Sequence, residues 1–308
     1  PGNGTCLATS EARLGLYAAV AARSVAMTKQ WIREGSKATF KFLPRRIMNK
    51  KAFENAFAVD MAMGGSSNTV LHLLAMANES GVKFDLKDID RISKRTPNIC
   101  RVAPSPTPEG KVYHMQDVHR AGGIHTIMGQ LATDKPATLH TELNTVTGKT
   151  VAQNLSAWSL RGKSLTAAVK KFYNDGAKLT GRTVAQVRAM LAGDKPVGKG
   201  AHKAAKLNAA DVIRTVAKAF TARGGLVALY GNIAPAGAIM KLAGLGPEMY
   251  QFTGTARIFE SQEDACEGIL GGKVQAGDVV VIRNEGPRGG PGMQEMLAPS
   301  SYMKGLGL

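Results

Sequence analysis

Residues 277–297 have the sequence GDVVVIRNEGPRGGPGMQEML, in which a β-branched run is followed at once by a segment rich in glycine and proline. The run at 278–283 has the composition of a buried strand, so the glycine-rich segment is expected at that strand's C-terminal end, where loops often bind ligands. Two glutamates, Glu285 and Glu295, flank four glycines and two prolines, with Arg288 between them. Glycines let a carboxylate sit close to a hard cation such as Mg²⁺. An elaborate surface turn with two exposed glutamates explains the residue types equally well.

Short β-branched runs bounded by glycine precede this strand. GGLVALYGN (224–232) and TARIFES (255–261) are predicted strands, and SQEDACEGILGGKV (261–274) is predicted to be a capped helix that ends at Gly271. The chain before these strands is mostly helical in pattern. Helices first and strands later predict an α-rich domain to residue 223 and a β-containing domain after it.

The helical part begins with an amphipathic pattern over 11–34, where the apolar candidates are Leu14, Tyr17, Val20, Val25 and Ile32. Further helices are predicted at 49–63, after the GGSSN stretch at 64–68, from Asp85 to Pro97, and at 115–131 with a break at Gly122-Gly123.

The chain is strongly basic, with a net charge of +17 over 308 residues. Residues 1–51 have ten Lys/Arg against two glutamates, a net +8, and residues 161–223 have fourteen against three aspartates, a net +11. Such segments suit a phosphate-rich or acidic partner such as RNA, although a solvated helical face is an equal alternative. The predicted partner surface consists of Lys170, Lys171, Lys178, Arg182, Arg188, Lys195, Lys199, Lys203 and Lys206.

Composition also limits the class of protein. Cys6, Cys100 and Cys266 are far apart and form no CxxC pair, which argues against a disulfide scaffold and favours a reducing compartment. No run of 18 apolar residues is present, so no membrane span is predicted. Pro1 stands where an initiator methionine would be, so the sequence is expected to be part of a longer polypeptide, without any targeting peptide.

Two further motifs contain candidate ligand-binding residues. GGSSN, with Ser66 and Asn68, begins a predicted helix, where free N–H groups bind anions, although helix capping alone also explains it. DVHRAGG places His119 and Arg120 before two glycines, and these residue types do acid–base work or bind a carboxylate. The simpler interpretation of DVHRAGG is a helix end with a polar face.

Several long strings resemble one enzyme family. KAFENAFAVDMAMGGSSNTVLHLLAMANESGV (51–82), YHMQDVHRAGGI (113–124), GGLVALYGNIAPAGAIMKLAG (224–244), RNEGPRGGPGMQEML and the opening PGNGTCLATSEAR are similar to dihydroxy-acid dehydratase, whose family includes 6-phosphogluconate dehydratase. The resemblance is strong before residue 130 and after 223, and weak in the basic stretch between. It implies an α/β fold with a helix-rich N-terminal α/β domain (1–223), followed by part of a β-barrel-like C-terminal domain (224–308).

The resemblance implies a chemistry. The family removes water from a 2,3-dihydroxy acid to give a 2-keto acid in valine and isoleucine synthesis. It uses an iron–sulfur cluster as Lewis acid, a Mg²⁺ that binds substrate oxygens, and a serine alkoxide as base. The family's magnesium-binding glutamate falls on Glu285, while Ser66, Asn68, His119 and Arg120 are expected to bind substrate. Asn284 and Arg288 replace a tyrosine and a lysine of the family motif, and neither change affects the carboxylate.

Other family residues match no position in this sequence. The three cluster cysteines and a Cys-Asp-Lys motif that completes the magnesium site are expected before Pro1, and the serine motif after Leu308, so these 308 residues alone are expected to be inactive, with no catalytic residue and neither cofactor held. Two hypotheses follow. The chain is either part of an active dehydratase, expected to be a homodimer, or a silent homologue serving as a basic structural subunit of a large assembly such as a mitochondrial ribonucleoprotein. The basic bias and reduced cysteines favour mitochondria.

Overall fold

A computed structural model describes residues 5–6, 11–39, 42–103, 105–133, 138–160, 164–171, 207–243, 245–286 and 296–308. The chain divides into two compact units, residues 1–244 and 245–308, and each is described by itself. The predicted domain boundary at 223/224 differs from this division, because the first two strands after residue 224, within residues 226–241, pack in the first unit. Among the described helices, none has the length and apolar character that crossing a bilayer requires.

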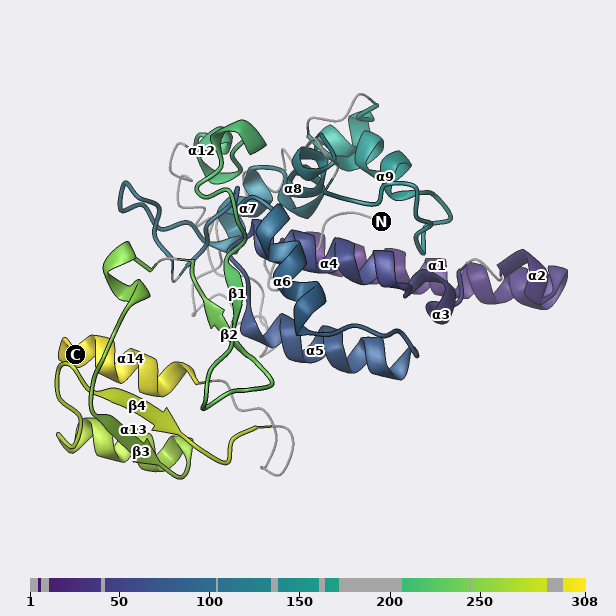
Figure 1. The fold of residues 1–308 in the computed structure, drawn as a ribbon. Helices are drawn as coiled ribbons and strands as arrows, with labels where there is room; N and C mark the ends of the chain where they lie inside the picture. Colours follow the sequence, from purple (N-terminus) through teal and green to yellow (C-terminus); the bar gives the residue numbers. More distant parts are fainter. Residues whose placement is uncertain are drawn as a thin grey trace, which may run out of the picture. The chain divides into compact units, whose positions relative to one another are not determined.

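The first unit is built mainly of helices (Figure 1). They are α1 (Glu11–Glu34), α2 (Ser36–Thr39), α3 (Pro44–Ile47), α4 (Lys50–Ala62), α5 (Ser67–Glu79), α6 (Leu86–Arg95), α7 (Met115–Arg120), α8 (Gly123–Leu131), α9 (Val151–Trp158) and α12 (Ala209–Val212), with a 3₁₀ turn, η2, at Val216–Lys218. The helices expected at 11–34, 49–63 and 85–97, and the break at Gly122-Gly123, are confirmed within two residues.

Local capping explains where several of these helices start. Asn49 accepts a hydrogen bond from the Ala52 N–H at the start of α4, and Asp85 accepts from two N–H groups at the start of α6. A capping box formed by Thr150 and Gln153 opens α9. These side chains satisfy N–H groups that the first turn of a helix leaves without partners, so the sequence alone specifies these starts.

Among the described residues of the first unit, one apolar core joins elements that are far apart in the sequence. It forms where α4, α6, α8 and strand β1 (Leu226–Leu229) meet, and its largest fully buried side chains include Phe57, Met61, Ile89, Ile92, Ile127, Leu131 and Leu226. β1 pairs antiparallel with β2 (Ala238–Lys241), in a register that places Leu226 opposite Lys241.

The apolar residues of α1 are placed differently from what amphipathicity suggests. The helix is confirmed, but Leu14, Tyr17, Val20, Val25 and Ile32 are each more than half exposed. The helix instead rests on its other face, where Arg23 reaches the Val146 carbonyl and lies over the Phe42 ring. A periodic pattern identifies an apolar face, but contacts elsewhere in the chain decide whether that face is buried.

The second unit contains a β-α-β arrangement. Strands β3 (Ala256–Phe259) and β4 (Val279–Ile282) are parallel and joined by α13 (Gln262–Leu270), and α14 (Leu297–Leu306) and the 3₁₀ turn η3 (Pro247–Tyr250) complete the described elements. Phe259, Ala265, Ile269 and Val274 form a small core beneath the two strands. In the part of the chain that the structure describes, strands pair only two by two, so the expected partial β-barrel is not seen and the fold is a helix-rich mixture of α and β.

Candidate metal and ligand sites

Glu285 lies at the carboxyl end of β4, where the chain turns sharply. Asn284 has a φ of 64°, in the left-handed region that asparagine enters more easily than most non-glycine residues. Its side-chain amide donates to Glu260 Oε2 at 2.9 Å, and Arg283 forms an ion pair with the same carboxylate. This turn directs Glu285 back toward the start of α13. The asparagine that replaces the family tyrosine therefore suits the backbone conformation found here.

The two carboxylate oxygens of Glu285 have different surroundings. Oε1 accepts a hydrogen bond of 2.7 Å from the Gln262 N–H in the first turn of α13, where the helix dipole stabilises negative charge. Oε2 is buried and has no hydrogen-bond partner among the described residues. A buried carboxylate oxygen without a partner is costly unless something else binds it. One oxygen of Glu285 therefore orients the side chain, and the other is available to a ligand.

This geometry fits one ligand of a Mg²⁺ site. Magnesium is commonly bound by one or two carboxylates and completes its shell with water and substrate oxygens. Within the described residues no group of three or more His, Cys, Asp or Glu gathers to hold a metal, so Glu285 is a single ligand there.

The described cysteines do not fit an iron–sulfur cluster. Cys100 is fully buried in the apolar core, and that burial raises its pKa to about 12, whereas a cluster needs thiolates. Cys6 is also buried, and Cys266 lies on α13 in the other unit. None of the three belongs to a group of three or more His, Cys, Asp or Glu side chains among the described residues.

The GGSSN stretch begins α5 as expected, and the carboxylate of Asp60 lies against its first residues. Asp60, near the end of α4, accepts from the Ser66 N–H at 3.1 Å and from the Thr69 hydroxyl at 3.0 Å. Burial raises the Asp60 pKa to about 6, although these hydrogen bonds oppose the rise. The Ser66 side chain makes no capping hydrogen bond, and Asn68 is half-buried beside it. Sequence reasoning missed Asp60, although it lies only six residues before Ser66.

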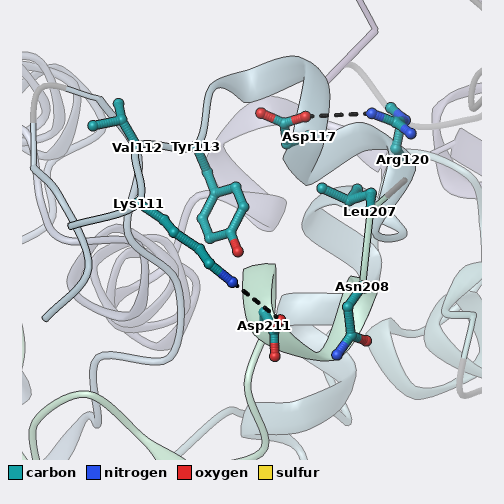
Figure 2. Close-up of a pocket in the computed structure, with 8 residues that line it drawn as sticks. All are labelled: Lys111, Val112, Tyr113, Asp117, Arg120, Leu207, Asn208 and Asp211. Carbon is teal, nitrogen blue, oxygen red and sulfur yellow. Dashed lines mark ion pairs between the residues drawn. The ribbon is translucent and has the colours of Figure 1, made fainter. Parts of the chain in front are cut away.

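Arg120 and His119 point into different surroundings. Arg120 lines a cavity of about 700 Å³, where its Nη1 lies 3.6 Å from Asp117 Oδ1 (Figure 2). His119 is buried, with Nδ1 3.0 Å from Thr5 Oγ1, and burial lowers its pKa. Adjacent residues on a helix face directions about 100° apart, so the two side chains of one motif do not share this cavity.

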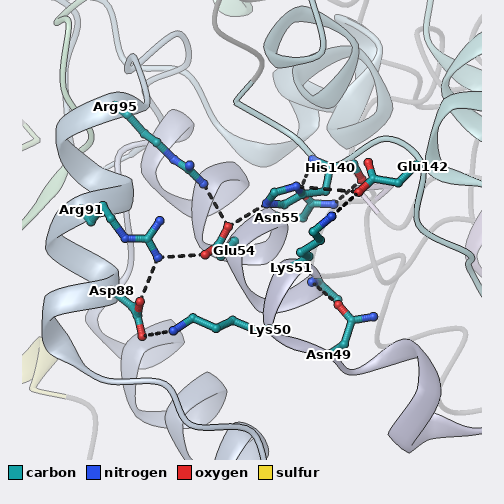
Figure 3. Close-up of polar contacts among 11 residues, drawn as sticks. Asn49, Lys50, Lys51, Glu54, Asn55, Asp88, Arg91, Arg95, His140 and Glu142 are labelled. Atoms are coloured by element: carbon teal, nitrogen blue, oxygen red, sulfur yellow. Dashed lines mark hydrogen bonds and ion pairs between the residues drawn. The ribbon is translucent and has the colours of Figure 1, made fainter.

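A polar cluster surrounds Glu54 on α4 (Figure 3). Its carboxylate contacts Arg91 at 2.8 Å, Arg95 at 3.3 Å and His140 Nε2 at 2.7 Å. The backbone of His140 is also held, because Asn55 donates to its carbonyl and accepts from its N–H. The cluster links α4 to α6 and to the segment around residue 140, so we interpret it as stabilising the fold. The sequence contained no signal for it, since Glu54 resembles any surface residue of an amphipathic helix.

The predicted basic partner surface is only partly described. Lys170 and Lys171 are exposed, and the other seven residues lie outside the described ranges.

Comparison with protein families agrees with the resemblance. The model described as "Dihydroxy-acid/6-phosphogluconate dehydratase N-terminal" matches residues 1–154, and that described as "Dihydroxy-acid/6-phosphogluconate dehydratase C-terminal" matches residues 211–308. The two matches together include most of the chain, in the family's order. The chain therefore belongs to the dihydroxy-acid/6-phosphogluconate dehydratase family.

Proposed function

We propose that this chain is part of a hydro-lyase that removes water from a 2,3-dihydroxy acid and yields a 2-keto acid. In the reaction C2 loses a proton and C3 loses its hydroxyl group as water, and the enol that results rearranges to the ketone. The observation that supports the proposal is Glu285, a carboxylate oriented through one oxygen while its other buried oxygen has no partner in the described chain.

The neighbouring backbone determines the position and the orientation of the Glu285 carboxylate. The Gln262 N–H fixes the orientation of Glu285, and the left-handed Asn284 brings it to that position. A Mg²⁺ bound there would attract the oxygens of the substrate and hold them in place. The remaining magnesium ligands and the cluster cysteines that the family implies are not among the described residues, so Glu285 is assigned binding and orientation only.

The substrate is proposed to be a branched-chain dihydroxy acid and not a sugar acid. The support is the similarity of the long strings around GGSSN and EGPRGGPGM to the branched-chain enzyme. Ser66 and Asn68 stay predicted substrate ligands, as do the homodimer and the mitochondrial location.

The experiment compares Glu285→Gln with Glu267→Gln, an exposed glutamate on α13 that serves as matched control. Mn²⁺ binding, followed by its paramagnetic resonance signal, and formation of keto acid by the cluster-loaded full-length protein are both measured. Loss of this ligand is expected to weaken Mn²⁺ binding and kcat/KM by about 100-fold or more, while the control stays unchanged. If Glu285→Gln binds Mn²⁺ as tightly as the wild type does, the assignment of Glu285 as a metal ligand is refuted. Failure of the loaded wild-type protein to turn over any dihydroxy acid refutes the reaction.

One observation favours a second candidate function. The nine basic residues predicted as a partner surface all fall between 154 and 211, outside both family matches. A basic segment added to an enzyme family suits a phosphate-rich partner, so an RNA-bound structural role is the alternative. Binding of a random single-stranded RNA that falls steeply with salt, and is lost when these nine residues are changed to glutamine, supports it. Salt-independent or absent binding excludes it.

A further inference from the structure

An open groove of about 460 Å³ lies beside α6 in the first unit. This volume is in the range of small-molecule sites. Tyr230, which directly follows β1, lines the groove together with charged residues of α6, namely Lys87, Asp90, Arg91 and Lys94. Two segments far apart in the sequence therefore build one surface that offers both charge and an aromatic ring.

Contacts on both sides of Tyr230 set its position against α6. The Ser93 hydroxyl of α6 donates to the Leu226 carbonyl of β1, which ties the strand to the helix. In the turn before β2, Gly237 has a φ of +102°, and a Cβ there would lie 3.0 Å from the Tyr230 ring and 2.9 Å from Leu86. The absence of a side chain at Gly237 thus lets the ring pack closely, while 55% of Tyr230 stays exposed. Part of the ring is held by the protein, and the rest is open to a ligand.

Two cations of the groove have hydrogen-bond donors to spare. The Lys87 ammonium group makes no ion pair or hydrogen bond with any described residue. Arg91 reaches Glu54 Oε1 and Asp88 Oδ1 at 2.8 Å each, both through Nη2 (Figure 3). Its Nε and Nη1 therefore donate to nothing in the described part of the chain, while the two carboxylates hold the guanidinium group in place.

The remaining charges of the groove neutralise each other. Lys94 Nζ lies 2.6 Å from Asp90 Oδ2 in an ion pair one helical turn apart. Three cations and one carboxylate give the lining a formal charge of +2, although the carboxylate partners of Arg91 outside the groove offset part of it. Lys87 and Arg91 are four residues apart on one helix face, where Cβ atoms lie about 5–6 Å from each other. One phosphate group is large enough to contact both.

We propose that this groove binds a nucleoside monophosphate, either free or as one unit of a single strand. The phosphate contacts Lys87 and the unpaired donors of Arg91, and the base stacks on Tyr230. Inorganic phosphate would leave the ring uncovered, and an apolar ligand would cover the cations without compensating their charge. Aromatic rings beside basic side chains are a general means of binding unpaired nucleotides. The site is separate from the nine basic residues of the predicted partner surface, and its test needs no dehydratase turnover.

Isothermal titration calorimetry of the whole chain tests the proposal with three probes. Adenosine monophosphate has both base and phosphate, adenosine lacks the phosphate, and ribose phosphate lacks the base. The nucleotide is expected to bind, and each partial ligand to bind about tenfold more weakly, since one loses the charged contacts and the other the stacking. Ribose phosphate binding as tightly as the nucleotide would show attraction by positive charge alone and overturn the proposal. Absence of heat with the nucleotide at millimolar concentration overturns it as well.

Variants at exposed positions locate the binding, and circular dichroism verifies their folding. Tyr230→Ser and Lys87→Met are each expected to weaken nucleotide binding about tenfold, whereas Tyr230→Phe keeps the ring and binds as the wild type does. Tyr17→Ser and Lys29→Met are the matched controls on α1, at a tyrosine that is 57% exposed and at an exposed lysine, and should have no effect. Nucleotide binding that survives both Tyr230→Ser and Lys87→Met places the ligand elsewhere and refutes the site.

A short single-stranded oligonucleotide of adenine distinguishes the two sources of the ligand. Binding of the oligonucleotide that is tighter than that of the mononucleotide, and is weakened by Tyr230→Ser, identifies a strand as the ligand. Equal binding of the two identifies the free nucleotide. Oligonucleotide binding that Tyr230→Ser leaves unchanged occurs elsewhere on the basic chain and counts against the groove.

Discussion

Replacement of Glu54 by glutamine should strongly destabilise the first unit, and the effect should depend on pH. The Glu54 side chain is only 10% exposed and contacts Arg91, Arg95 and His140 (Figure 3). Burial by itself would raise the Glu54 pKa, but hydrogen bonds from Arg91 and His140, with the charges of both arginines, outweigh burial and lower the pKa from 4.5 to about 2. The ionised form is therefore favoured in the folded chain.

The lowered pKa of Glu54 gives the size of its contribution to the free energy of unfolding. The lowering of the Glu54 pKa from 4.5 to about 2 corresponds to about 3 kcal/mol of unfolding free energy at pH 7, where the carboxylate is ionised in both states. This contribution is complete above the unfolded pKa of 4.5 and disappears as pH falls through the folded pKa near 2. By the same linkage about half of it, roughly 1.5 kcal/mol, remains at pH 3.

Urea unfolding of wild type and Glu54→Gln at pH 7 and pH 3 measures the effect. The variant is expected to be about 3 kcal/mol less stable at pH 7, and the gap should narrow to about 1.5 kcal/mol at pH 3. Glu142→Gln is the matched control, because Glu142 pairs with Lys51 at 2.9 Å but is 58% exposed, and such surface pairs contribute about 0–1 kcal/mol. Equal losses in the two variants at pH 7, or a gap that does not change with pH, would refute this account of the cluster.

Three further predictions concern single positions. Gly65→Ala should cost about 2 kcal/mol or more in urea unfolding, because Gly65 has a φ of +78° and a Cβ there would clash with the Leu226 side chain; a loss under about 0.5 kcal/mol would contradict this. Burial raises the Asp60 pKa to about 6, so the free energy of unfolding of the wild type should fall as pH rises from about 4 to 6, where Asp60 ionises more easily in the unfolded chain. Asp60→Asn should remove this fall, and a wild-type profile that is flat over that range would disprove the prediction. Cys100 should resist a thiol reagent until the chain unfolds, whereas the half-buried Cys266 reacts in the native state; mass spectrometry of labelled peptides distinguishes them.

Much of the secondary structure was predictable because its determinants are local. The start of α6 follows from Asp85 and the following apolar spacing, and β3, α13 and β4 follow from β-branched runs, a capping serine and bounding glycines. Capping bonds join residues two or three positions apart, so a short window of sequence contains both partners. The family membership was also readable, because long strings such as those around GGSSN leave little ambiguity.

The site was less predictable. Glu285 was identified through resemblance, but the Gln262 N–H that orients it is 23 residues away. The prediction that His119 and Arg120 serve one site rested on their being adjacent in sequence. Adjacent side chains on a helix point in different directions, and only Arg120 lines the cavity. The cavity beside Arg120 had no sequence signal, because it joins residues near 111 with residues near 211.

By itself, the sequence determined many of the helices and strands, the excess of positive charge, the identity of Glu285 as a candidate ligand, and the family. Tertiary structure alone decided that Glu54 is buried among three basic groups, that Asp60 occupies the start of α5, and that the apolar face of α1 is exposed. The physical reason is the range of the interactions. Periodicity and capping act within one or two turns of chain, whereas burial and electrostatic compensation depend on which distant segments meet when the core forms.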